Sequence, residues 1–507
     1  MFTSFVTGRF TRMLAACALV FGIGFADNTQ CQAIQESVAP AAAAPQDPKA
    51  GESAGLTGAE AKVIPENRQR AIEFLVNEMS QLTPGKISDN AALKDAYNTA
   101  AGSLVDEKAE ESLEILKTAA TANPDMPPAK LLMAAMFFAG GNPQQGFVYL
   151  EQAAVDAPQF PLVYVAFARI AISQQRKTDA RVLLEKSTSL LDSGNWSEAV
   201  KTHLTDSNLD ASADLYLLAN ELPDARKTLE TMLERKPDYS RAVLRLAEVA
   251  FKEEKIDQSL SLLKLYSTNE KDARAPELML ATFFQRTGKP EGAAKWILDA
   301  YDKHPEDIAV LTEYAAWRVN KEEFNEANLA LAKIEQLAGK MPVATLLKGK
   351  MAFAQQAYEL AESRFAELNK LEPTNVEIAN LWAMSLAESS SSDKLAMALE
   401  KAMQNMEAQP QNPFAATILG WVYFRQKNFE QANVWFSRAA QSNNLPPEAA
   451  YYFAKFLQHL GEKEKALELV DGALKAENLF LYRTSAITLK AVLTAGDQSL
   501  KAPGGNN

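Results

Sequence analysis

The sequence predicts an all-α fold, a right-handed α-solenoid of about eleven helical hairpins with a capping helix at each end. Two observations lead to this prediction. Apolar residues follow helical spacing over long stretches, with proline or glycine between the blocks, and the alternation typical of strands is essentially absent. Small residues also recur at a nearly constant interval, whose length suits one helix–turn–helix unit.

The composition fits such an array and argues against several other classes. Of the 507 residues, 47% are hydrophobic and 23% are charged, so the chain as a whole is not disordered. Lys and Arg number 52 against 64 Asp and Glu, and the resulting net charge of −12 disfavours a nucleic-acid-binding surface. Two cysteines and three histidines disfavour a zinc module and a disulfide framework.

Residues 1–26 are predicted to form a signal peptide. Arg9 and Arg12 precede the apolar run 13–26, which is too short to span a bilayer comfortably. Cleavage is expected at the end of this run or after Ala33. The other interpretation, a buried first helix, is disfavoured because no amphipathic pattern accompanies the run.

A second pattern in the same segment resembles a bacterial lipobox that ends at Cys17. The apolar residues follow Cys17 instead of preceding it, so lipid attachment there would leave an apolar new N-terminus. We therefore expect simple cleavage and favour a periplasmic or secreted protein over a lipid-anchored one. No other run in the sequence is long enough to span a membrane.

The segments around the repeats have their own expected roles. Residues 27–66 are rich in Ala, Pro and Gly and lack an apolar period, which predicts a flexible tether. Residues 67–87 and 479–495 are expected to be capping helices that cover the apolar ends of the array. The last segment, 496–507, is expected to be disordered.

The repeat array is assigned to residues 88–478, and its phase comes from three series of positions. The first series consists of small residues: Ala100, Ala134, Ala168, Ala213, Ala247, Ala281, Ala315, Gly349, Ala383, Gly420 and Ala454. Twelve positions later ten of the eleven occupants are again small, with Leu395 as the exception. Sixteen positions later all are large and apolar: Leu116, Leu150, Leu184, Leu229, Leu263, Ile297, Leu331, Phe365, Leu399, Phe436 and Val470.

Each series has a physical meaning in a helical hairpin. Small residues let two helices approach closely, and the large residue one turn later fills the space between them. Five units also carry a proline 24 positions after the first small residue, where the second helix should end. In this order of small, small, large and proline positions the sequence resembles the tetratricopeptide repeat family.

Two intervals between small sites are longer than the others. The interval from Ala168 to Ala213 holds an insertion near Trp196. The interval from Ala383 to Gly420 is assigned an insertion of three within 406–412. Residues 389–392 are expected to be a polar turn inside one hairpin. Neither insertion is expected to interrupt the stack of hairpins.

The sequence lacks the motifs of the common enzyme classes, so no catalytic residue, cofactor site or metal site is predicted. There is no HExxH, GxSxG or GxxxxGK[ST] pattern. Some members of the resembled family clamp a C-terminal carboxylate with a lysine three positions before the first small site and an asparagine one position after it. No repeat in this chain has lysine at the first of these positions or asparagine at the second, which disfavours a cytosolic adaptor of that kind.

The resemblance implies that the first helix of each hairpin lines a concave groove, so inward positions are candidates for partner binding. The candidates in the last two repeats are Trp421, Phe424, Arg425, Tyr451, Lys455 and Gln458. Aromatic rings with Arg and Lys could hold a peptide by stacking and charge pairing. The alternative is that Trp421 and Phe424 pack between neighbouring repeats.

The function these observations favour is a non-enzymatic scaffold exported to the bacterial cell envelope. It would bind protein or peptide segments in its groove and support assembly of an envelope machine, such as one for polysaccharide export, pilus assembly or outer-membrane assembly. The alternatives are an enzyme or enzyme-associated module with an unrecognised groove site, and a cytoplasmic adaptor with a misread leader.

Overall fold

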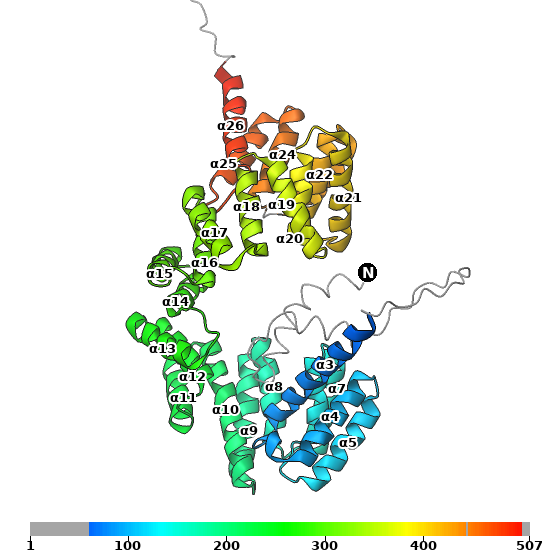
Figure 1. Ribbon diagram of the computed structural model, residues 1–507, viewed down its shortest axis with the longest axis vertical. Coiled ribbons are helices and arrows are strands. Elements are labelled where there is room, and N and C mark those ends of the chain that lie inside the picture. The colour runs from blue at the N-terminus through cyan, green and yellow to red at the C-terminus, as the bar shows by residue number, and fades with distance from the viewer. Residues whose placement is uncertain (1–59, 443–444, 499–507) are drawn as a thin grey trace, which may run out of the picture. The chain divides into compact units, whose positions relative to one another are not determined.

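The structure is a computed structural model that describes residues 60–442 and 445–498. Within these ranges every regular element is a helix, and successive helices pack as pairs (Figure 1). The predicted all-α solenoid is confirmed. The chain divides into two compact units, here called unit 1 (up to residue 271) and unit 2 (from residue 272). The predicted signal peptide, residues 27–59 of the predicted tether, and residues 499–507 lie outside the described residues.

In the described chain, unit 1 holds an N-terminal helix, a short 3-10 helix and five hairpins. Its elements are α3 (Glu60–Leu82), η1 (Ile87–Asp89), α4 (Ala91–Val105), α5 (Ala109–Ala122), α6 (Ala129–Ala139), α7 (Pro143–Asp156), α8 (Pro161–Ser173), α9 (Lys177–Ser193), α10 (Glu198–Ala219), α11 (Leu222–Arg235), α12 (Ser240–Lys252) and α13 (Ile256–Asn269).

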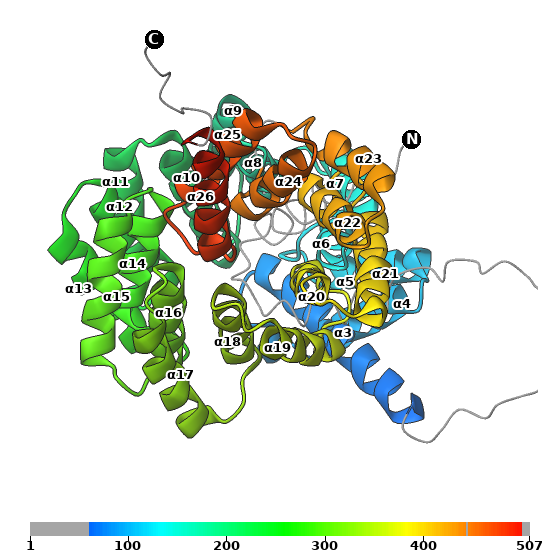
Figure 2. The ribbon, with the colours of Figure 1, turned by 90° about the horizontal axis from the view of Figure 1, so that it is seen from above.

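Unit 2 holds six further hairpins and a C-terminal helix among the described residues. Its elements are α14 (Pro276–Arg286), α15 (Pro290–Lys303), α16 (Ile308–Asn320), α17 (Phe324–Ala338), α18 (Pro342–Ala354), α19 (Tyr358–Leu371), α20 (Val376–Ala387), α21 (Ser392–Ala408), α22 (Pro413–Arg425), α23 (Phe429–Ala439), α24 (Pro447–His459), α25 (Lys463–Leu474) and α26 (Arg483–Gln498). Figure 2 shows the hairpins of unit 2 following a curve from α16 to α25.

The small sites lie where the two helices of a hairpin meet, as their spacing predicts. Ala100 and Ala247 are fully buried, and each accepts a hydrogen bond through its main-chain oxygen from the serine twelve positions later. Ser112 Oγ donates to Ala100 O and Ser259 Oγ donates to Ala247 O, each at 2.8 Å. The two helices are therefore in direct contact at these positions.

The turn inside each hairpin follows one local pattern with one exception. In ten of the eleven hairpins of the described chain, a residue of this turn has positive φ. These residues are Glu107, Gly141, Gln175, Asn220, Glu254, Gly288, Glu322, Gln356, Lys427 and Gly461. In the α22–α23 turn, for example, Asn428 N donates to Tyr423 O at 2.9 Å. This left-handed residue reverses the chain and lets the turn satisfy carbonyls at the end of the first helix.

The exception, the turn between α20 and α21, is where one sequence prediction was wrong. Ala398 and Ala402 are buried at 0% and 1% exposure, whereas Leu395 and Leu399, the predicted packing residues, are only half-buried. The three extra residues therefore lie in this turn and not in 406–412. A longer turn delays the start of the second helix, and this moves a different pair of side chains onto the packed face.

The insertion near Trp196 lengthens two helices instead of adding a loop. The helices that flank it, α9 and α10, have 17 and 22 residues, against 13 residues in α8 and 14 in α11. Trp196 lies between them, with its ring edge-to-face with Phe160 at 5.7 Å and its Nε1 donating to Leu190 O. As a result α10 begins well before its small site Ala213, and its first turns add side chains to unit 1 that a standard repeat lacks.

Helices also stand at both ends of the described chain. Helix α3 begins at Glu60, inside the segment predicted as tether, and packs on α4 and α6. Helix α26 packs on α25 and continues to Gln498, beyond the predicted end of the cap at residue 495. Among the described residues, no helix is both long enough and apolar enough to cross a membrane.

A pair of glycine substitutions checks the close helix contacts. A Cβ atom at Gly349 on α18 would lie 2.6 Å from Phe365 Cε1, so we expect Gly349→Ala to cost about 1–3 kcal/mol of unfolding free energy. Gly472 on α25 has open space around the same position, and Gly472→Ala should gain about 0.5–1 kcal/mol because alanine favours a helix. Urea unfolding of both variants measures the difference, and shifts of the same sign would contradict the assigned packing.

Candidate functional site

The structure brings the six predicted groove residues of unit 2 together. Trp421, Phe424 and Arg425 lie on α22, and Tyr451 and Lys455 lie on α24. The Trp421 ring stacks on Phe424 at 5.4 Å and lies 6.3 Å from Tyr451, and Lys455 Nζ donates to Gln458 Oε1 at 3.2 Å. The predicted set is thus one spatial cluster on two adjacent first helices.

Trp421 belongs to the packed interior of this cluster. Its exposed fraction is 3%, its ring stacks on Tyr452 at 4.6 Å, and its Nε1 donates to Glu388 Oε1 at 3.0 Å. Phe424 is half-buried and meets Phe456 edge-to-face at 6.0 Å. The geometry favours the interpretation that both rings pack between neighbouring repeats.

The carboxylate of Glu388, which is not among the predicted groove residues, accepts several hydrogen bonds in the cluster. Glu388, at the end of α20, accepts hydrogen bonds from Trp421 Nε1, from Arg425 Nη1 at 2.7 Å and from Tyr482 Oη at 2.7 Å. Burial lowers the pKa of Lys455, and Arg425 adds to this effect while Glu388 opposes it. Because Arg425 donates to Glu388, its guanidinium is part of an internal ion pair.

The chain's own C-terminal segment covers the same surface. Leu481 N donates to Glu448 Oε1 at 3.1 Å, the Tyr482 ring stacks on Tyr451 at 4.7 Å, and Arg483 Nε donates to Glu322 Oε1 at 2.6 Å. Tyr482 is 2% exposed. Trp421, Arg425 and Tyr451 are thus used by internal contacts. Phe424, Arg425, Lys455 and Gln458 are partly exposed. Their role in partner binding stays a prediction.

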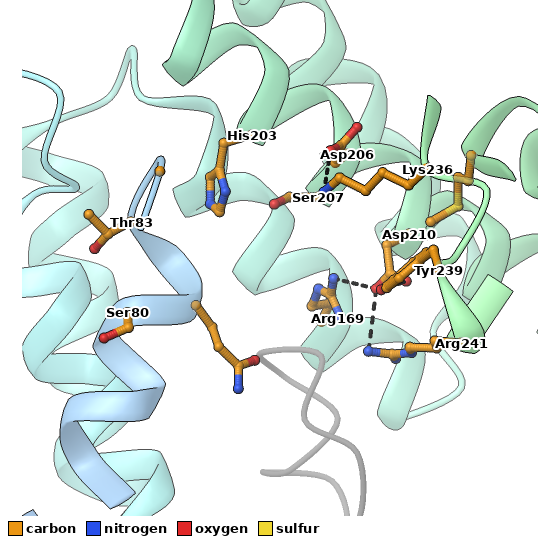
Figure 3. Close-up of a pocket in the computed structure, with 13 residues that line it drawn as sticks. Ser80, Thr83, Arg169, His203, Asp206, Ser207, Asp210, Lys236, Tyr239 and Arg241 are labelled. Carbon is orange, nitrogen blue, oxygen red and sulfur yellow. Dashed lines mark hydrogen bonds and ion pairs between the residues drawn. The ribbon is translucent and has the colours of Figure 1, made fainter. Parts of the chain in front are cut away.

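A polar pocket in unit 1 has a different character (Figure 3). It is a cavity of about 440 Å³. Its polar lining comes from the end of α3 and the residue after it, from α8, from α10, from the turn after α11 and from α12: Ser80, Gln81, Thr83, Arg169, His203, Asp206, Ser207, Asp210, Lys236, Tyr239 and Arg241.

Asp210 is the centre of the ion network in this pocket. Its two carboxylate oxygens accept from Arg169 Nη2 at 2.7 Å and from Arg245 Nη1 at 2.6 Å, and Tyr239 Oη adds a third bond at 3.1 Å. Burial opposes ionisation of Asp210, yet Arg245 and Arg169 outweigh it and hold the pKa of this carboxyl well below its usual range. Asp210 is therefore charged, and both of its carboxylate oxygens accept hydrogen bonds within unit 1.

Arg169 has one guanidinium nitrogen bound to Asp210 and one buried nitrogen without a partner among the described residues. Its side chain is 8% exposed, and Nη2 is held by Asp210. Within the part of the chain that the structure describes, Nη1 of Arg169 is buried and has no hydrogen-bond partner. A buried donor without an acceptor is costly, so this atom marks a place where a ligand could supply the acceptor.

His203 presents a second open atom in the same pocket. Burial, assisted by Lys236, lowers the pKa of His203, so its ring is neutral at pH 7. The ring bonds to the main chain of Leu82, and among the described residues Nε2 has no partner. Nε2 of His203 is therefore a second buried polar atom for which a ligand could supply the partner.

None of the residues predicted to bind a partner lies in this pocket, although two features of the sequence point to it. Asp210 is the only carboxylate three positions before a first small site, and Arg169 directly follows the small site of the preceding repeat. His203 and Asp206 belong to the first half of α10, which the insertion near Trp196 lengthens. Those residues do not fall on repeat positions, so the periodicity could not place them.

Two family models match parts of the chain. One, described as tetratricopeptide repeat, matches residues 216–279, and the other, described as anaphase-promoting complex, cyclosome, subunit 3, matches residues 390–490. Hairpins of the same design recur throughout the described array, which supports the resemblance of the chain to tetratricopeptide repeat proteins. A scaffold for protein–protein interaction is the general role that follows. No curated protein sequence matches the chain.

Several solved structures match the chain at low sequence identity. A tetratricopeptide repeat protein from Parabacteroides merdae is 13% identical, with 57% of this chain and 99% of that chain covered and a TM-score of 0.31. Yeast Tom70 is 12% identical, with 82% and 98% covered and a TM-score of 0.30. The Cut9–Hcn1 hetero-tetramer of the APC/C is 11% identical, with 88% and 90% covered and a TM-score of 0.35.

Proposed function

We propose that this protein is an exported scaffold of the bacterial cell envelope that holds an extended segment of a partner protein in the polar pocket of unit 1. The open Nη1 of buried Arg169 is the observation that carries the choice of site. In unit 2 the comparable inward side chains Trp421, Arg425 and Tyr451 already have partners within the chain. The partner would contribute to assembly of an envelope machine.

Export is the part of the proposal that rests on the sequence. The basic residues Arg9 and Arg12 and the short apolar run after them are typical of a signal peptide. Cell fractionation followed by N-terminal sequencing tests it. A shortened chain outside the inner membrane is the expected result, and an intact N-terminus in the cytoplasm would remove the envelope role.

Partner binding should depend on the open arm of Arg169. Arg169→Lys keeps a positive charge for Asp210 but lacks the second arm of the guanidinium, so the ion pair can persist while the ligand contact is lost. We expect recovery of the main crosslinked envelope partner to fall about tenfold, the effect of losing roughly 1.4 kcal/mol of binding free energy. Crosslinking in cells and pull-down of the full chain measure this.

Arg226→Lys is the matched control, because Arg226 pairs with Glu253 at 2.6 Å outside the pocket. It should recover partners as the parent does. Lys236→Ala provides a second test at the pocket itself, since the Lys236 side chain is 55% exposed and its loss should not unfold unit 1. Full recovery by folded Arg169→Lys and Lys236→Ala would show that partners bind elsewhere.

A further inference from the structure

The pocket of unit 1 carries an excess of positive charge in an acidic protein. Three carboxylates in and beside the pocket, Asp206, Asp210 and Asp214, are held by ion pairs. The cations that pair with them are Arg169, Arg235, Lys236, Arg241 and Arg245. Five cations therefore pair with three carboxylates around this pocket, whereas the whole chain has a net charge of −12.

Part of this excess is buried, which limits how water can compensate it. The side chains of Arg169 and Arg245 are 8% and 10% exposed, and that of Asp210 is 5% exposed. Both oxygens of Asp210 already accept from cations. An acceptor for the open Nη1 of Arg169 must therefore come from outside this network, and a negatively charged one would also offset the excess charge.

Arg169 needs an acceptor from the ligand, and His203 offers a second atom without a partner. Its Nε2 is buried without a partner, and His203 lines the same cavity as Arg169 (Figure 3). In the tautomer with the ring proton on Nδ1, Nε2 is an acceptor that needs a donor. The dianion of a phosphate monoester offers acceptors only, so it supplies no donor to an accepting Nε2. A single acidic residue of a peptide offers a carboxylate with one charge and a main-chain N–H close to it, which matches both open atoms.

We propose that the pocket recognises an acidic side chain of an extended partner segment, with the carboxylate on Arg169 and a neighbouring main-chain N–H on His203. This inference rests on the proposed function and specifies the chemistry of the partner. The site differs from a groove made only of repeat positions, because the C-terminal end of α3 and the lengthened α10 supply part of its lining.

Binding of short blocked peptides to the purified chain that begins after the predicted signal peptide tests the chemistry directly. Titration calorimetry with tetraglutamate, tetraglutamine and tetralysine peptides compares a carboxylate, a neutral amide and a cation. We expect tetraglutamate to bind about tenfold more tightly than tetraglutamine, and to weaken as salt is added because charge attraction is screened. Equal binding of tetraglutamine would overturn the acidic specificity and leave the proposed scaffold role standing.

Variants of the pocket locate the binding site, and inorganic phosphate tests another class of ligand. Arg169→Lys should reduce tetraglutamate affinity about tenfold, whereas Arg226→Lys should leave it unchanged. His203→Phe removes Nε2 and should weaken peptide binding without changing the salt dependence. Retained affinity in folded Arg169→Lys would overturn the location of the site. No detectable binding of tetraglutamate to the parent would overturn the acidic class of ligand. Tighter binding of inorganic phosphate than of tetraglutamate would indicate a phosphorylated partner instead.

Discussion

Replacing Tyr482 with alanine is expected to cost about 3–5 kcal/mol of the unfolding free energy of unit 2. The Tyr482 ring stacks on Tyr451 and meets Phe353 edge-to-face at 5.1 Å, so its removal leaves a cavity among aromatic side chains. Its hydroxyl donates to Glu388 and lies 2.5 Å from the hydroxyl of Tyr452. Loss of this group also removes a donor from a carboxylate that binds Trp421 and Arg425.

Two further variants separate the contributions to this effect. Tyr482→Phe keeps the ring and should cost only about 1–3 kcal/mol, the penalty of leaving buried polar partners unsatisfied. Ile487→Ala on the same helix changes a side chain of a residue that is 55% exposed and should stay within about 0.5 kcal/mol of the parent. Urea unfolding followed by tryptophan fluorescence measures all three. A Tyr482→Ala protein as stable as the parent would mean that the C-terminal segment does not hold unit 2 together.

The second large effect concerns Glu78 and depends on pH. Glu78 on α3 is 0% exposed, and neither of its carboxylate oxygens has a hydrogen-bond partner of normal geometry among the described residues. Burial raises the pKa of Glu78 from 4.5 to about 7, and nearby Asn77 offsets only part of this rise. The folded protein thus keeps a proton on Glu78 over a range in which the unfolded chain has lost it.

The sign of the pH dependence follows from this difference in bound protons. Stability from the neutral carboxyl is fully present below pH 4.5 and is lost as the pH rises to about 7, because the folded state binds the additional proton over that interval. Glu78→Gln is neutral at every pH. We expect it to be more stable than the parent by about 3 kcal/mol at pH 8, since a rise of about 2.5 pKa units corresponds to about that free energy, and to lose this advantage near pH 4.5.

Glu73→Gln is the matched control for this prediction. Glu73 lies on the same helix, and it is exposed and bonds to Gln69. Its substitution should leave the pH profile of unfolding unchanged. Denaturant unfolding of unit 1 at several pH values between about 4.5 and 8 provides the comparison. A constant difference between Glu78→Gln and the parent would contradict the proposed protonation of Glu78.

The hairpin architecture was predictable because it depends on local chemistry. A small residue at Gly420, a second at Ala432 and a large one at Phe436 describe one helix contact within a single hairpin. Such contacts repeat, so the pattern is visible without knowledge of distant residues. The misplaced three-residue insertion shows the limit of this argument. The longer interval from Ala383 to Gly420 indicates that three residues are added, but not where they lie. Their position in the turn after α20 determines which side chains of α21 face the core.

Whether an inward-facing side chain becomes part of a groove or of the core was decided only by the tertiary structure. Trp421 occupies an inward repeat position under both interpretations, and it is buried because Tyr452 and Glu388 pack against it and Tyr482 closes the cluster. That outcome depends on a segment beyond the last repeat, which carries no repeat signal.

The pocket of unit 1 depends on the same kind of long-range contact. Arg169 and Asp210 are 41 residues apart, and the insertion between them sets how α8, α10 and the end of α3 meet. The charges and the insertion were readable in the sequence, but their juxtaposition was not, because burial and hydrogen-bond partners are properties of neighbours in space. The open atoms of Arg169 and His203 therefore emerged only from the folded chain.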